Sequence, residues 1–128
     1  MTDKTVAVRR DLVTLVSIPG KGRGVVARKR IPKNTLIEAA PVIKMKKRDW
    51  LMRETVLSHY PFEWNEPPFV HALALGWVSL VNHADLPNCR CEVDTGDEVL
   101  RLFTIADIAK GEELSHNYGI DPWFDVKP

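Results

Sequence analysis

The sequence predicts a single α+β domain that is mostly β, with several short sheets and one main helix. At 128 residues the chain is long enough for one hydrophobic core and too short for two ordinary domains. Short segments rich in β-branched residues alternate with glycine and proline turns along most of the chain. Only residues 48–60 show the spacing of an amphipathic helix. We therefore treat residues 1–128 as one domain.

The N-terminal part predicts three strands around a glycine-rich loop. Residues 6–9, 12–18 and 25–28 are the strand segments. Gly20, Gly22 and Gly24 lie at alternate positions between the last two. Such glycines indicate either turns that need positive φ or a backbone that approaches a ligand closely. The segment is not a dinucleotide fingerprint, because the third glycine and the following helix are missing.

The sequence contains a weak internal repeat, with one copy in the first third of the chain and the other in the last. Residues 26–37 resemble residues 103–114, and both segments read as strand, tight turn and strand. Asn34 stands where Gly111 stands in the other copy. Asparagine is the non-glycine residue that best tolerates the left-handed conformation, so we expect the two turns to share one geometry.

The middle of the chain predicts a strand, a helix and a hairpin. Residues 41–45 form the strand, and the helix at 48–60 places Met52, Val56 and Tyr60 on one face before Pro61 stops it. Residues 62–68 are rich in proline and aromatics and are expected to form an ordered loop, followed by an apolar segment at 69–75 and a helical turn at 76–81. Residues 89–93 and 99–104 bracket turn residues and predict a hairpin.

Composition narrows the classes of partner. The net charge of +1 gives no reason to expect direct binding of nucleic acid. No apolar run approaches the roughly 20 residues that span a bilayer, so no membrane association is expected. The polar start has no signal-peptide pattern, and we expect an intracellular protein, in the cytoplasm or nucleoid, or in a host nucleus if the protein is delivered there. Cys89 and Cys91 are the only cysteines, and a disulfide between them is not expected. Two thiols alone cannot make a closed zinc site, so no metal site is expected.

Two polar segments concentrate the groups that can do chemistry. The first contains Asn82 and His83 and ends on Pro87 and Asn88; the second runs from Gly111 through Glu-Glu-Leu to Tyr118 and Gly119. Together they resemble the signature of the SET-domain protein-lysine methyltransferases. Residues 22–28, which begin Gly-Arg-Gly, resemble the family's N-terminal cofactor motif. The similarity is closest to the minimal, SET-only proteins of viruses and bacteria.

The resemblance implies a fold, a cofactor and a substrate. The fold is the β-clip-like SET domain with a C-terminal pseudoknot: N-terminal strands in 6–45, a helix and insert region in 46–75, the C-terminal motifs in 76–119 and an aromatic tail in 120–128. The reaction transfers a methyl group from S-adenosyl-L-methionine to a lysine side chain and leaves S-adenosyl-L-homocysteine, without a metal. The implied partner is a lysine-containing protein or peptide, a histone or a histone-like protein, and the protein is expected to pair as a homodimer.

The site residues follow from the same motifs. Tyr118 would be the catalytic tyrosine, and it would also contact the cofactor and the substrate. The other implied cofactor-binding residues are Gly22, Arg23, Gly24, Asn82, His83 and Trp123. The implied substrate-binding residues are Tyr60, Trp77 and Tyr118. For His83 a structural role that ties its loop to the Tyr118 segment is an equal alternative, and Tyr60 could instead be the last buried residue of its helix.

Two rival functions remain open at this point. Cys89, His83 and Asp85 have the residue types of a cysteine hydrolase, but no family-specific cysteine signature accompanies them. A catalytically silent SET-like module that binds peptides or partners is the more serious rival, because a fold alone does not guarantee a function. The presence of Tyr118 and of the glycine loop favours the enzyme.

Overall fold

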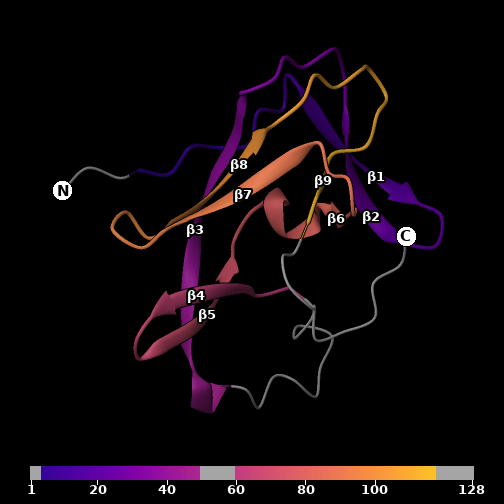
Figure 1. Ribbon diagram of the computed structural model, residues 1–128. Coiled ribbons are helices and arrows are strands. Elements are labelled where there is room, and N and C mark those ends of the chain that lie inside the picture. Colours follow the sequence, from indigo (N-terminus) through magenta and orange to yellow (C-terminus); the bar gives the residue numbers. More distant parts are fainter. Residues whose placement is uncertain (1–3, 50–59, 118–128) are drawn as a thin grey trace.

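The computed structural model describes residues 4–49 and 60–117. In these parts the strands form one five-stranded sheet and two two-stranded sheets (Figure 1). The fold is mostly β, as the sequence predicts. The helix expected at 48–60 falls largely on residues outside the described parts, as do Tyr118 and Trp123. No helix in the described parts is long and apolar enough to cross a membrane.

A long strand, β3, joins the two halves of the main sheet. The strand order is β4-β5-β3-β8-β7, and all pairs are antiparallel. The first half of β3 pairs with β8 and its second half pairs with β5, so the sheet changes partners along one strand. The bounds are β3 Leu36–Lys46, β4 Phe62–Glu66, β5 Phe69–Ala74, β7 Cys89–Asp94 and β8 Val99–Thr104.

The two smaller sheets carry the motif segments. Strands β1 (Val13–Ile18) and β2 (Gly22–Ala27) form an antiparallel pair. Strands β6 (Asn82–His83) and β9 (Ser115–His116) are short and pair in parallel. A 3-10 turn, η3 (Trp77–Leu80), leads directly into β6 and lies near the centre of the molecule (Figure 1).

The internal repeat pairs with itself. Ile31 and Ile108 occupy equivalent positions in the two copies, and each main-chain N–H donates to the other's carbonyl at 2.8 Å. The predicted shared turn is confirmed, because Asn34 and Gly111 both have positive φ, 65° and 85°. Each of these two residues donates its N–H to the opposite copy, Asn34 to Thr104 and Gly111 to Ala27. The copies therefore meet about a local pseudo-twofold axis that passes between the two isoleucines.

The main core lies where the sheets and η3 meet. Its members are apolar side chains that are almost completely removed from water, which makes their burial the main source of stability. The largest of those fully buried in this cluster are Ile31, Ile37, Leu100, Leu102, Ile108, Leu114, Val13, Val25, Val78 and Val81. Because Val78 and Val81 belong to this cluster and come just before β6, the segment that carries Asn82 is anchored to the core.

Several strand boundaries differ from those predicted. Residues 62–66 form a strand and not a loop, and the signal was present, because Phe62 and Trp64 alternate with the exposed Glu63 and Asn65. Residues 6–9 do not form a strand; Val6 makes only an isolated bridge to Ala39. The hairpin at 89–104 and the helical turn after Gly76 are confirmed.

Candidate active site

Strands β6 and β9 bring together the two polar motifs that are far apart in the sequence. Asn82 pairs with Ser115, and His83 pairs with His116. The N–H of Ala84 continues the contact by donating to the carbonyl of His116 at 3.0 Å. The start of the 82–88 loop therefore lies beside the segment that leads to Tyr118. This pairing fits the C-terminal pseudoknot that the family resemblance implies, although the residues from Tyr118 onward lie outside the described parts.

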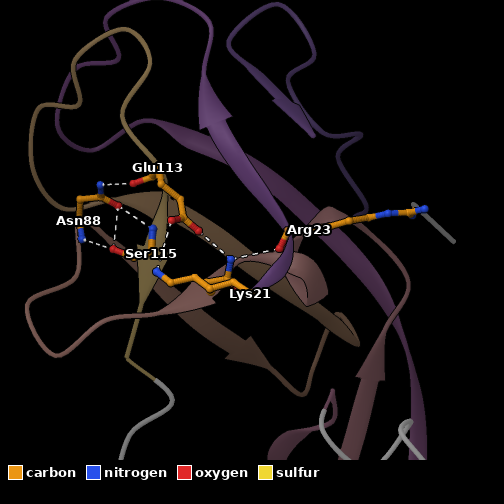
Figure 2. A network of polar contacts seen from close by, with 6 residues as sticks. Lys21, Arg23, Asn88, Glu113 and Ser115 are labelled. Carbon is orange, nitrogen blue, oxygen red and sulfur yellow. Dashed lines mark hydrogen bonds and ion pairs between the residues drawn. The ribbon is translucent and has the colours of Figure 1, made fainter. Parts of the chain in front are cut away.

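Asn82 connects three segments through one end of its amide. Its Nδ2 donates to the main-chain carbonyl of Arg23 on β2 at 3.1 Å and to the Glu113 carboxylate at 2.7 Å. Lys21 lies on the other side of that carboxylate, with its Nζ 3.5 Å from Oε1 (Figure 2). The glycine segment, the 82–88 loop and the Gly-Glu-Glu-Leu motif therefore meet at one point.

The glycines before and within β2 are required for different physical reasons. Gly20 and Gly22 have positive φ, 78° and 81°, so they serve the turn between β1 and β2. Gly24 has no such φ, but a Cβ there would lie 2.6 Å from Ile18 Cγ1, 2.9 Å from Glu113 Oε2 and 3.1 Å from Asn82 Nδ2. Gly24 is therefore needed so that the Asn82–Glu113 hydrogen bond can pack against the strand.

Arg23 takes part in the polar network around Asn82 through its main chain and not through its side chain. Its carbonyl accepts the hydrogen bond from Asn82, whereas the exposed side chain extends away from the polar network (Figure 2). The backbone between Gly22 and Gly24 is thus the part of the segment that faces the motif residues.

Asn88 holds the far end of the loop. Its Oδ1 accepts from the N–H of Ser115 at 2.8 Å, and its Nδ2 donates to the carbonyl of Glu113 at 2.8 Å (Figure 2). Both ends of this amide are occupied by main-chain groups. Asn88 is therefore a structural residue that fixes the loop to β9.

The buried carboxylate of Glu38 holds the turn η3, which leads into Asn82. Glu38, on β3, is 5% exposed and accepts hydrogen bonds from the N–H groups of Val78, at 2.8 Å, and Trp77, at 3.4 Å. Burial raises the pKa of this carboxyl, while the two hydrogen bonds act in the opposite direction. A side chain at Gly76 would collide with the Glu38 carboxyl group. Glu38 thus holds η3, and with it the start of β6.

The two histidines of the paired strands are tied into the protein. His83 Nε2 lies 3.1 Å from a carboxylate oxygen of Asp85. His116 is 2% exposed, and its ring centroid is 5.7 Å from that of Phe62. Burial lowers the pKa of His116 to about 4, and the neighbouring His83 adds to this lowering. His116 is therefore neutral at physiological pH. The backbone pairing of His83 fits the structural role, and a direct ligand contact stays a prediction.

Of the aromatic residues predicted for the site, Trp77 and Tyr60 lie in the described parts of the chain. Trp77 lies on η3, packs partly buried against the core, and has the guanidinium carbon of Arg10 5.3 Å from its ring centroid. Tyr60 is half-buried just before β4. Tyr118 and Trp123 lie outside the described residues, so their roles stay predictions. Trp64, an aromatic residue on β4, is a core residue with 1% exposure.

The geometry speaks against a cysteine hydrolase. Cys89 is 1% exposed, and burial raises the pKa of its thiol to about 12. Burial likewise raises the pKa of Cys91. A nucleophilic cysteine needs an accessible thiolate, which neither residue provides. In the described ranges no group of three or more His, Cys, Asp or Glu side chains is arranged to hold a metal ion.

Two contributors to the site were not singled out from the sequence. Glu113 was visible only as part of its motif, and nothing in the local pattern connects it to Asn82. Glu38 lies in an apolar strand, where a lone carboxylate is the only hint of a buried partner. Both form their contacts with residues distant in the sequence.

Comparison with known proteins agrees with this arrangement. The SET domain family model matches residues 22–119. A Schizosaccharomyces pombe protein named as a histone-lysine N-methyltransferase specific for H3 lysine-37 is 36% identical over 107 residues, which cover 82% of this chain and 71% of that protein. A Cryptococcus neoformans histone-lysine N-methyltransferase specific for H3 lysine-36 is 30% identical over 118 residues, 85% of this chain but only 14% of the relative.

A solved structure shares the fold. The crystal structure of a Plasmodium falciparum protein, described as a candidate histone methyltransferase, superposes with a TM-score of 0.66 and 23% sequence identity, and the match covers 88% of this chain and 97% of that one. At this identity the likeness concerns the fold alone. The family model carries the assignment further, because it matches residues 22–119, which include Arg23, Asn82 and Glu113 of the polar network. The Schizosaccharomyces pombe relative supports the same assignment by its identity and coverage. The chain therefore belongs to the SET-domain family of protein-lysine methyltransferases.

Proposed function

We propose that the protein binds S-adenosyl-L-methionine at the junction of β2, β6 and the Glu113 segment, and that it methylates a lysine of a histone or a histone-like protein. The observation that carries the proposal is the Asn82 amide, which is fixed by Arg23 and Glu113 at the place where all three family motifs meet. The names of the fungal relatives support a histone as the substrate.

The residues present fit the amino-acid end of such a cofactor. Asn82 offers an oxygen acceptor, and the backbone of Gly22 to Gly24 lies directly beside it. Small residues at this place allow a ligand to approach the main chain. Gly22, Arg23, Gly24 and Asn82 would hold that end, His83 would contribute through its loop, and Trp123 would stack on the adenine.

The remaining task of the chain is to present a neutral amine in line with the methyl group. When bound, S-adenosyl-L-methionine supplies an electrophilic methyl on a sulfonium. A lysine ammonium, with a pKa of about 10.4, has no lone pair and must lose a proton first. Tyr60 and Trp77 would line an apolar channel that lowers this pKa by desolvation, and the phenolic oxygen of Tyr118 would orient the amine. Alignment and exclusion of water then account for most of the rate enhancement.

Calorimetric titration with S-adenosyl-L-methionine, together with a methylation assay on histone H3, tests the proposal. We expect saturable binding to the parent protein and about 10- to 100-fold weaker binding to Asn82→Ala, because a hydrogen bond to a charged group contributes about 1.5 to 3 kcal/mol. Tyr118→Phe should retain binding and lose most of its turnover. Binding without methylation of any histone would favour a silent binding module, and absence of binding would contradict the proposed cofactor.

Location and assembly complete the proposal. A histone-like substrate requires the protein to act inside a cell, in the cytoplasm, nucleoid or nucleus. We also propose a homodimer, which sedimentation at working concentration would test; a monomeric mass would contradict it.

A further inference from the structure

Glu113 accepts hydrogen bonds from both asparagines of the 82–88 loop, one with its side chain and one with its main chain. Its carboxylate oxygens divide their contacts, with Oε2 accepting from Asn82 Nδ2 at 2.7 Å and Oε1 lying 3.5 Å from Lys21 Nζ. Its main-chain carbonyl accepts from Asn88 at 2.8 Å (Figure 2). The hydrogen bond from Asn88 fixes the backbone of Glu113 and therefore restricts where its carboxylate can lie.

The two ends of the Asn82 amide differ: among the described residues the nitrogen is hydrogen-bonded and the oxygen is available. The two hydrogens of Nδ2 are directed at the Arg23 carbonyl and at the Glu113 carboxylate, so the donor capacity of the amide is used. Among the described residues Oδ1 accepts no hydrogen bond that competes with a ligand. The reversed amide would set its oxygen against a carbonyl and a carboxylate, which is repulsive. The surroundings thus impose one orientation, with the oxygen available.

We propose that Glu113 is a positioning residue that makes the site selective for a ligand with a hydrogen-bond-donating ammonium. This inference rests on the proposed function, in which the ligand is S-adenosyl-L-methionine. The oxygen of Asn82 can accept from the amino group of the cofactor's amino-acid end, and it repels a carboxylate. Glu113 acts through Asn82 and need not touch the ligand itself.

The simpler reading, a stabilising ion pair between Glu113 and Lys21, accounts for less. The two side chains are 23% and 22% exposed and 3.5 Å apart. Partly exposed pairs of this kind contribute little to stability. The shorter contact is the one to Asn82, and Gly24 is kept free of a side chain where this contact packs. The packing therefore protects the hydrogen bond to Asn82.

A thermodynamic cycle between Glu113 and the ligand's amino group tests the inference. Binding of S-adenosyl-L-homocysteine, and of the same molecule without its α-amino group, is measured by calorimetry on the parent and on Glu113→Ala. We expect Glu113→Ala to weaken S-adenosyl-L-homocysteine about 10-fold and to leave the affinity for the deaminated analogue unchanged. Glu113→Gln, which keeps an oxygen acceptor, should recover most of the loss.

The controls separate the possible failures. Lys21→Met should keep the preference for the amino group, because the Asn82–Glu113 bond remains. Glu92→Ala, which removes an exposed carboxylate paired with Arg90 at 3.6 Å, should behave like the parent. Equal weakening of both ligands by Glu113→Ala, or no weakening of either, would overturn the inference while the proposed function stands. A parent protein that binds neither ligand would overturn both. If Glu113→Ala does not fold, the same cycle on Glu113→Gln and Glu113→Asp decides, because only the shorter Asp loses the contact with Asn82.

Discussion

Asn82 and Asn88 both bind the segment around Glu113, but they use their amides differently. Asn88 engages both ends with main-chain groups of Glu113 and Ser115. Among the described residues, Asn82 engages only its nitrogen and leaves its oxygen available. A side chain whose polar groups are all satisfied by the protein supports the fold, whereas one that is fixed at one end is prepared for a ligand. The difference separates the structural end of the 82–88 loop from the binding end.

Gly24→Ala should displace the Asn82 end of the loop and so remove the difference between Asn82 and Asn88. The added Cβ would lie 2.9 Å from Glu113 Oε2 and 3.1 Å from Asn82 Nδ2, so these groups must separate. We expect a loss of about 1 to 3 kcal/mol in the free energy of unfolding and more than about 10-fold weaker cofactor binding. Urea unfolding and calorimetry measure the two effects. Gly96→Ala is the matched control, because its Cβ would meet only Asp94 Oδ1 at 3.4 Å; unchanged cofactor binding in Gly24→Ala would contradict the packing argument.

Asn88→Ala should lower stability more than cofactor affinity, because Asn88 lies at the structural end of the 82–88 loop. It leaves the N–H of Ser115 and the carbonyl of Glu113 without their side-chain partner, so we expect a loss of about 2 kcal/mol in the free energy of unfolding. Cofactor affinity at a temperature where the variant is folded should change much less than in Asn82→Ala. Leu86→Ser, at a side chain in the middle of the loop that is 94% exposed, should be neutral. Greater loss of stability from Asn82→Ala than from Asn88→Ala would reverse the assignment.

The smallest expected effect is a pH dependence at the β6–β9 pairing that supports both asparagines. The pKa of His116 in the folded protein is about 4, below the value near 6.5 expected in the unfolded chain. The unfolded state therefore binds the proton more readily, and stability is complete above pH 6.5 and declines as the pH falls toward 4. Between pH 7 and 5.5 the loss should be about 1 kcal/mol. Urea unfolding of the parent and of His116→Asn measures it, and equal slopes in both proteins would contradict the assignment.

Local patterns predicted those parts of the fold that depend on local rules. The turns at Asn34 and Gly111 and the hairpin at 89–104 follow from turn residues and β-branched segments. Strand β4 was missed because the nearby prolines outweighed a real alternation of Phe62 and Trp64 with exposed residues. Asn82 and the glycine segment, which the family motifs assign to one cofactor site, are in contact, and their role at that site stays a prediction.

What the sequence could not supply are contacts between distant positions. Glu38 binds the N–H groups of η3, and Glu113 binds Asn82, through pairings that no local periodicity encodes. The reason for Gly24 is likewise tertiary, because its neighbours Glu113 and Asn82 come from other segments. The placement of Tyr118 and Trp123 stays a prediction, since both lie outside the described residues.

The pairing of the repeat with itself has a consequence for how the chain folds. Ile31 donates to and accepts from Ile108, so the first copy finds its partner only after most of the chain has been synthesised. Such long-range pairings carry a high loop-closure entropy, and proteins dominated by them fold in about milliseconds to seconds. During translation the side chains of Ala27, Ile31 and Ile37, which are buried in the folded protein, therefore stay exposed until residues 103–114 are available. Binding of chaperones to ribosome-held nascent chains should be strongest in this interval and end when the second copy emerges.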